Sequence, residues 1–170
     1  MRYLFTAMLA MFMTFGNIST IQAADGDMRF VRITEIGAEN FSHDLQFVAT
    51  DINVKFDEIK RTPQFDSVDD NMSSWLTPFT IDGKSGFIFF LVNSDGYIQT
   101  IGISSDFIPL AKFYAVEDIV LTEIGLSEAE RQQLSNSLDD VRSVFCESSQ
   151  RRIWIASGDD GTIAIIATEQ

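Results

Sequence analysis

Apolar residues along this chain fall into short runs, which turn-forming residues separate. Phe87–Val92 and Tyr97–Ile103 flank the tetrapeptide Asn93–Gly96. An Asp-Gly pair between two apolar, β-prone runs is a strong signal for a β-hairpin. Arg152–Ala156 and Thr162–Ala167 flank a second Asp-Gly pair in the same manner. The pattern therefore predicts two β-hairpins, and the first run, apolar on both faces, is expected at the centre of a sheet.

The two predicted hairpins align with each other at an offset of 65 residues. Asp95-Gly96 matches Asp160-Gly161, and Phe89 matches Trp154. Because hairpins reuse the same turn residues, this match indicates shared turn chemistry more than an internal repeat.

Ser127–Cys146 has the clearest helical pattern. Ser127 and Glu130 have the spacing of a capping box. The apolar residues that follow recur at the spacing of one helix face; they are Leu134, Leu138, Val141 and Phe145. We expect one amphipathic helix over the whole segment.

Asn40–Arg61 fits two patterns. An apolar stripe from Phe41 to Ile59 lies on one face of a helix, with Ser42 as the expected N-cap. Ile52–Asp57, however, alternates between apolar and polar residues as a half-buried strand does. The longer stripe favours a helix, and strands remain the alternative.

Three further segments complete the prediction. Met28–Ile36 is expected to be a strand, and Leu110–Val116 a short helix that a strand over Glu117–Glu123 follows. Thr62–Ser85 is polar and turn-rich, so a loop with one helical turn at Asp70–Trp75 is expected. The chain is thus predicted to be an α+β domain, with an antiparallel sheet built from two hairpins and covered by one or two amphipathic helices.

The amino-terminus has the pattern of an export signal. Arg2 precedes an almost unbroken apolar run from Tyr3 to Phe15, and the segment ends in the small residues Ala23 and Ala24. The run is shorter than the ~20 residues that a membrane span needs. We expect residues 1–23 to be a cleaved signal peptide and residues 24–170 a single domain, exported to the periplasm or the extracellular space without a membrane span.

Charge narrows the possible partners. The chain has 170 residues, 12 Lys and Arg against 25 Asp and Glu, and a net charge of −13. Cleavage after Ala23 removes Arg2 and no acid, which takes the net charge to −14. We expect no nucleic-acid partner, because phosphate contacts need Lys and Arg. An acidic surface instead attracts a basic protein.

The residues that usually carry catalysis are scarce. His43 and Cys146 are the single histidine and the single cysteine, and they lie in different segments. Two such residues cannot fill the four positions of a structural zinc site, and no nucleophile motif surrounds them. We expect no cofactor, no metal and no nucleophilic enzyme; His43 is expected to be solvated and Cys146 an inert, partly buried thiol, with an intermolecular disulfide as the alternative.

The acidic loop is the best candidate contact surface. Its carboxylates lack the spacing of a calcium loop. We therefore expect a protein-binding module, such as an inhibitor or an immunity-type neutraliser of a basic toxin or hydrolase. The residues expected to contact the partner are Asp66, Asp69, Asp70, Asn71 and Trp75, together with Asp159 and Asp160.

Two other functions stay open. The segment Phe87–Gly102 (FIFFLVNSDGYIQTIG), preceded by a predicted helix, resembles the extracytoplasmic PAS-like sensor domains. This resemblance covers one hairpin and implies a domain that binds a small ligand. A hydrolase that uses a pair of carboxylates is the second alternative, because such pairs follow no spacing rule in the sequence.

Overall fold

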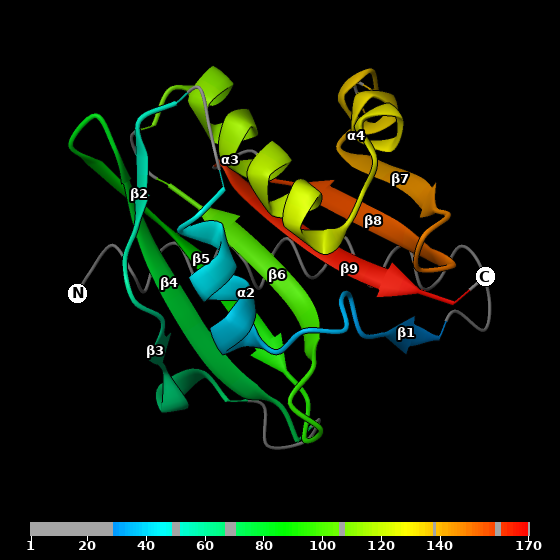
Figure 1. Ribbon diagram of the computed structural model, residues 1–170, viewed down its shortest axis with the longest axis horizontal. Helices are drawn as coiled ribbons and strands as arrows, with labels where there is room; N and C mark the ends of the chain where they lie inside the picture. Colours follow the sequence, from blue (N-terminus) through cyan, green and yellow to red (C-terminus); the bar gives the residue numbers. More distant parts are fainter. Residues whose placement is uncertain are drawn as a thin grey trace.

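An antiparallel sheet forms the frame of the molecule (Figure 1). A computed structural model describes residues 29–48, 52–66, 71–105, 108–137, 139–158 and 161–169, and the predicted signal peptide lies outside these ranges. The strands run in the order β2-β4-β5-β6-β9-β8-β7, with β1 paired to β9 and β3 to β4. They are β1 (Phe30–Val31), β2 (Val54–Phe56), β3 (Lys60–Arg61), β4 (Ser73–Ile81), β5 (Lys84–Val92), β6 (Ile98–Ser104), β7 (Val141–Cys146), β8 (Arg151–Ser157) and β9 (Thr162–Thr168).

The described helices are α2 (Ala38–Leu45), α3 (Leu110–Ile124) and α4 (Glu128–Ser135), with a 3-10 turn, η1 (Pro63–Phe65). The predicted α+β class with an antiparallel sheet is confirmed. The predicted hairpins are β5–β6 and β8–β9, and their turn glycines, Gly96 and Gly161, have φ of 87° and 75°. The sheet is larger than two hairpins, since β4 and β7 extend it on either side. No described helix is long and apolar enough to cross a bilayer.

The 65-residue match between the hairpins corresponds to equivalent places in the sheet. β4-β5-β6 and β7-β8-β9 are two three-stranded meanders that meet at the β6–β9 pair. At the centre of that pair Thr100 stands opposite Ile166 and Ile101 opposite Ile165. The offset of 65 residues does not hold within this pair, because it would match Thr100, which shares a face of the sheet with Ile166, to Ile165 in the core on the other face.

The predicted helix over Asn40–Arg61 is wrong in its second half. α2 begins two residues earlier than expected, with Gly37 as its N-cap, and ends at Leu45. The alternating segment forms β2 instead, where Phe56 pairs with Phe79. Ser42 is not a cap: its hydroxyl lies 2.7 Å from that of Thr77 in the buried contact between α2 and β4.

The predicted loop over Thr62–Ser85 is also wrong. It contains β4, a nine-residue strand, and the expected helical turn at Asp70–Trp75 falls partly on the start of that strand. Serine and threonine side chains in β4 occupy some of the buried positions, so the sequence of this strand does not show a regular alternation of apolar and polar residues. Thr77 is fully buried, and its pairing with the Ser42 hydroxyl removes the cost of placing a polar group there.

The boundaries of the carboxyl-terminal helices differ from the prediction too. A single helix, α3, replaces the expected helix and strand over Leu110–Glu123, because its apolar residues pack at helical spacing. The predicted capping box of Ser127 and Glu130 is confirmed, but α4 ends at Ser135 and the rest of the expected helix is β7. In β7, Val144 and Cys146 alternate into the core. Met28–Ile36, expected to be a strand, contributes only the two residues of β1.

Helices α2 and α3 lie over one face of the sheet, which we call the inner face (Figure 1). The rings of Phe41 in α2 and Phe90 in β5 meet edge to face, with centroids 5.7 Å apart. Lys112 of α3 forms an ion pair with Asp82 in the β4–β5 turn. The largest apolar cluster joins the helices to this face, so the inner face holds the main core.

Candidate functional site

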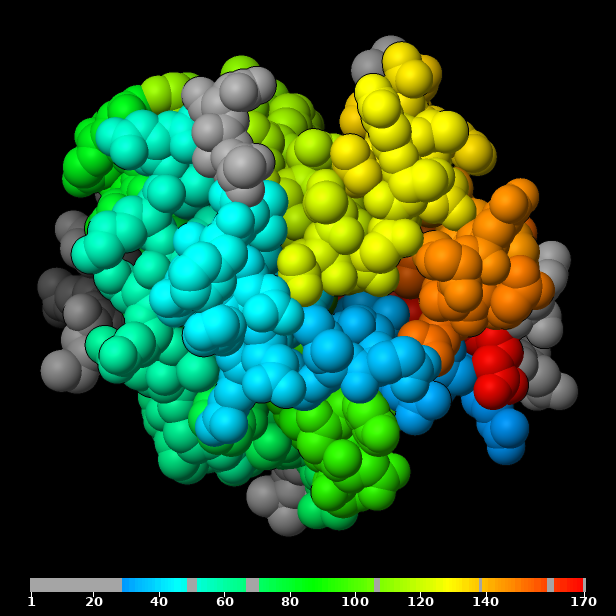
Figure 2. Space-filling model, viewed as in Figure 1, coloured from blue at the N-terminus to red at the C-terminus, as the bar shows by residue number. Residues whose placement is uncertain are grey.

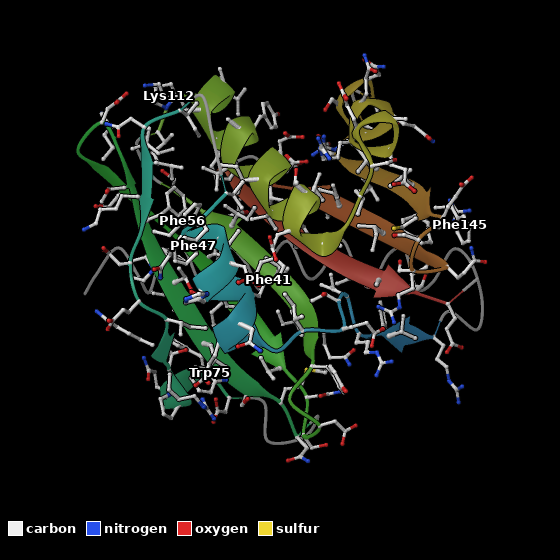
Figure 3. All side chains as sticks on the ribbon, viewed as in Figure 1. Phe41, Phe47, Phe56, Trp75, Lys112 and Phe145 are labelled. Atoms are coloured by element: carbon white, nitrogen blue, oxygen red, sulfur yellow. The ribbon has the colours of Figure 1, made fainter. Side chains whose placement is uncertain are left out.

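A groove of about 740 Å³ opens where the start of α2 faces the start of β4 and the β5–β6 turn. One wall contains Arg61 of β3, Asp66, Asn71 and Trp75 of β4. Figure 3 labels Trp75 at this end of the sheet, beside β3. The groove therefore unites three of the residues that the sequence predicted to contact a partner: Asp66, Asn71 and Trp75.

Arg61 and Asp66 form a paired fork in this wall. The two guanidinium nitrogens of Arg61 donate to the carboxylate of Asp66 at 2.5 and 2.7 Å. The backbone N–H of Ser74 donates to the same carboxylate at 2.9 Å, and the Arg61 guanidinium lies 5.5 Å from the ring centre of Trp75. Hydrogen bonds from Arg61 hold the pKa of the Asp66 carboxyl well below its usual range, although burial opposes the shift. Asp66 is thus engaged in holding the loop to β4.

Replacing Asp66 with Asn is expected to lower the free energy of unfolding by about 1–2 kcal/mol at pH 7, because charge-assisted hydrogen bonds are lost. The folded-state pKa of Asp66 is depressed, so its stabilisation is complete above the unfolded-state pKa, about 3.9, and is lost as the pH falls through the folded-state value. Urea unfolding at pH 7, 5 and 3 should show an equal difference between the variant and the wild type at pH 7 and 5 and a smaller difference at pH 3, where the loss has begun. Asp57→Asn, at an exposed pair with Lys55, is the control and should change little. A difference that stays constant with pH would show that charge is not the cause.

The opposite wall is the β5–β6 turn against the start of α2. The side-chain oxygen of Asn93 accepts from the backbone N–H of Asp95 at 3.1 Å and of Tyr97 at 2.9 Å. Tyr97 also forms a β-bridge with Gly37, the N-cap of α2. These bonds hold the turn and the helix start together. The groove offers an indole ring and side-chain amides to a ligand, while its arginine and its aspartate neutralise each other.

The other predicted contact residues are not placed by the structure. Asp69, Asp70, Asp159 and Asp160 lie outside the described residues. Asn71, next to the first two, has a left-handed backbone with φ of 51°.

A second cavity, of about 290 Å³, lies between α3, α4 and β7. Four carboxylates line it, together with the Arg142 guanidinium and the hydroxyls of three serines. No three of the described His, Cys, Asp or Glu side chains come together in a way that could hold a metal ion. The carboxylates are those of Glu117, Asp118, Asp139 and Asp140; we call this the acidic cavity.

A buried ion pair forms the floor of the acidic cavity. Glu117 and Arg142 are 4% and 8% exposed, and one guanidinium nitrogen of Arg142 lies 2.9 and 3.2 Å from the two carboxylate oxygens. Arg142 also donates to the carbonyl of Leu134 at 3.3 Å, and its Nε is buried without a hydrogen-bond partner among the described residues. Burial raises the pKa of Glu117, and the positive charge of Arg142 opposes that rise.

The rim of the cavity is more acidic than its floor. Arg131 binds Asp118 at 2.8 Å, whereas Asp139 and Asp140 are exposed and form no ion pair within the described part of the chain. Sequence reasoning missed this site because it placed Glu117 in a strand. At helical spacing Glu117 falls beside Phe113 and Val120, both buried, and a carboxylate there needs a basic partner.

The isolated candidate residues are not brought together. His43 is exposed on α2, as expected, with a 66% exposed side chain. Cys146 is fully buried and not partly buried as expected, and it lies on the strand β7 and not on the expected helix. Phe79 of β4, an aromatic residue near Trp75 in the sequence, is fully buried in the core. Comparisons with protein-family models, with curated proteins and with solved structures found no match to this chain.

Proposed function

We propose that this chain is an exported, acidic protein-binding module whose partner is a basic protein, in the manner of an inhibitor or an immunity-type neutraliser. The observation that carries this proposal is the acidic cavity. Two carboxylates without an ion-pair partner among the described residues, those of Asp139 and Asp140, lie at its rim. The helices around the cavity carry further acids of the same kind. The hairpins and the rest of the sheet serve as the frame that presents this layer.

The charges of the chain are distributed unevenly. Most described Lys and Arg side chains are already in ion pairs with acids of the same chain, including Arg61, Arg131 and Arg142. The excess negative charge therefore falls on acids that have no Lys or Arg partner among the described residues. On and beside the helices, which Figure 2 shows across one face of the molecule, these acids are Glu39, Asp44, Glu123, Glu128, Glu130, Asp139, Asp140 and Glu147.

The cavity suits one basic side chain of a partner. Arg142 neutralises Glu117 at the floor, so an incoming Lys or Arg meets net negative charge at the rim, from Asp139 and Asp140. The serine hydroxyls can accept the hydrogen bonds that such a side chain donates. The surrounding acids would steer the partner and raise its association rate.

A matched pair of double variants tests this proposal. Asp139→Asn with Asp140→Asn removes two charges at the cavity; Glu58→Gln with Asp95→Asn removes two unpaired charges away from it. Each protein is immobilised, exposed to the exported fraction of the source organism at low salt, and eluted at high salt. The wild type and the control pair are expected to retain the same basic protein, and the cavity pair to lose at least about tenfold in affinity for it.

Two results would contradict the proposal. If no basic protein is retained at low salt, the partner class is wrong. If both pairs of substitutions weaken binding equally, net charge alone is responsible and the cavity is not the contact.

The predicted contact residues of the acidic loop divide into two groups in the structure, those free to meet a partner and one that is already paired. Asn71 and Trp75 remain proposed contacts, because they line the groove. Asp66 belongs to the wall through Arg61 and contributes no free charge.

The groove favours a second candidate function, the binding of a small ligand in the manner of PAS-like domains. Its wall includes Val92, Asn93 and Gly96, from the hairpin that carries the resemblance. Trp75 in this wall supplies a fluorescence probe. A small polar ligand that quenches Trp75 emission in the wild type, but binds weakly to Asn71→Ala, would support this function over the first. A carboxylate hydrolase is less well supported, because Arg142 and Arg131 occupy two of the four cavity carboxylates.

A further inference from the structure

The groove beside Trp75 has the composition of a site for an uncharged, polar molecule. Its volume of about 740 Å³ lies in the range of small-molecule pockets. Uncharged polar side chains make up much of its lining; they are Asn40, Asn71, Ser73, Asn93 and Ser94. The Arg61 guanidinium is already paired with the Asp66 carboxylate. Among the described residues that line the groove, Glu39 is the charged side chain without an ion-pair partner, so the groove does not suit an anion.

The wall that contains Trp75 is held rigidly. Trp75 (Figure 3) is partly buried, and its Nε1–H donates to the Ser73 hydroxyl at 3.2 Å, which fixes the edge of the indole ring. The Arg61 guanidinium stands over the ring, 5.5 Å from its centre. Arg61 is held in turn by the Asp66 carboxylate and by the Ser74 carbonyl, to which it donates at 2.9 Å. This wall therefore presents an apolar ring with hydrogen-bonding groups beside it.

The opposite wall is also formed before any ligand binds. Gly37 forms a β-bridge with Tyr97, and a Cβ built on Gly37 would lie 3.2 Å from the Gly96 carbonyl oxygen. The start of α2 and the β5–β6 turn therefore meet through their backbones. Two backbone N–H groups of the turn engage the side-chain oxygen of Asn93, so a ligand would meet the N–H donors of that amide. Gly37 makes no side-chain cap, and the N–H groups of the first turn of α2 are further donors on this wall.

We propose that the groove binds a neutral saccharide of one or two rings. The C–H groups of a sugar ring are apolar and pack on an aromatic ring, whereas the hydroxyls around its edge both donate and accept hydrogen bonds. The groove offers an indole for the first and amides, serine hydroxyls and the Glu39 carboxylate for the second. This inference names the ligand class of the second candidate function, on which it rests, and it is independent of the acidic cavity.

Charge and hydrogen bonding argue against other small ligands. A phosphate ester or an acidic sugar would meet Glu39 and a paired Arg61, in a chain whose net charge is −13. A purely apolar ligand would leave the amides and hydroxyls of both walls without hydrogen bonds, which lowers affinity. A nucleoside or a neutral peptide could contact the indole but carries fewer hydroxyls than a disaccharide, and both enter the test as comparison ligands.

A titration with a defined set of ligands tests the ligand class. The chain has two tryptophans, so Trp154→Phe leaves Trp75 as the sole indole emitter. This variant is titrated with maltose, cellobiose, lactose and N,N′-diacetylchitobiose, and with uridine and N-acetyl-alanyl-alanine amide for comparison. We expect at least one disaccharide to change Trp75 emission saturably, and neither comparison ligand to do so at the same concentration. Saturation-transfer NMR on the wild-type chain replaces the titration if Trp154→Phe does not fold.

Substitutions in the groove locate the bound sugar. Asn40→Ala, in the first turn of α2, removes one lining amide and favours the helix, whereas Trp75→Leu removes the ring. Each is expected to weaken binding about tenfold, measured by titration calorimetry. His43→Ala, at an exposed position of the same helix that does not line the groove, is the matched control and should leave the affinity unchanged. Asn40→Ala decides the location by itself if Trp75→Leu does not fold.

The outcomes separate this inference from the two proposed functions. If uridine or the peptide binds and no disaccharide does, the saccharide class is wrong and the small-ligand function stands. If no ligand of the set binds, the saccharide inference is overturned, and the small-ligand function loses its support. Sugar binding that neither Asn40→Ala nor Trp75→Leu weakens would overturn the assignment to this groove. Retention of a basic protein at the acidic cavity is measured separately, so its failure leaves the saccharide result intact.

Discussion

Replacing Glu117 with Ala is expected to lower the free energy of unfolding by about 3–5 kcal/mol. Glu117 and Arg142 are both buried, and the substitution would leave the guanidinium in the core without its counter-charge. Arg142 already has one nitrogen without a partner, so it has little else to bind. The loss would appear in urea unfolding, followed by circular dichroism, as a lower midpoint with an unchanged dependence on denaturant.

A double substitution separates the charge from the shape. Glu117→Leu with Arg142→Met removes both charges and keeps apolar volume, and it is expected to be less destabilising than Glu117→Ala alone, because a buried pair that is replaced whole costs little. Glu123→Ala is the control and should change the free energy of unfolding by less than about 1 kcal/mol. Glu123 is a partly buried carboxylate on the same helix, and burial and the nearby charge of Asp44 raise its pKa. Additive losses in the double variant would contradict the inferred coupling.

Replacing Gly86 with Ala is expected to destabilise the protein by about 1–3 kcal/mol, and Gly86→Val by more. Gly86 of β5 pairs with Phe79 of β4, and the Phe79 ring lies over it. A Cβ at position 86 would lie 2.4 Å from the tip of that ring, far closer than atoms can approach. The ring has little room to move, because it is fully buried and packs 5.9 Å from the ring of Phe56.

The neighbouring position provides the control for Gly86. Ser85 is exposed on the opposite side of the same strand, and Ser85→Ala should be nearly neutral by the same unfolding measurement. Phe79→Leu shortens the ring's reach, so the cost of Gly86→Ala should be smaller in that background. An equal cost in both backgrounds would show that the ring is not the obstacle.

The candidate site was partly predictable because polar loops border grooves. Asp66, Asn71 and Trp75 were identified from a turn-rich, acidic segment, and all three line one groove. Their roles were not predictable. The ion pair between Arg61 and Asp66 joins β3 to the loop before β4. It forms only because β3 pairs with β4, and the residues of the loop do not predict that pairing.

The acidic cavity was not predictable at all. Its walls come from α3, α4, β7 and the end of β8, which tertiary packing brings together. Glu117 and Arg142 are 25 residues apart, and each alone resembles an ordinary surface charge in the sequence.

Local sequence by itself determined the hairpins, the capping box and the α+β class. A two-residue Asp-Gly signal and a Ser-x-x-Glu box act through bonds within a few residues, so their outcome does not depend on the rest of the chain. Charge and composition led only to the proposal that a partner is basic. Tertiary structure alone decided the rest: that Ser73–Ile81 and Val141–Cys146 are strands, and where the unpaired acids lie. The physical reason is that strand pairing and burial are contacts between distant segments, which override weak local preferences once the sheet has formed.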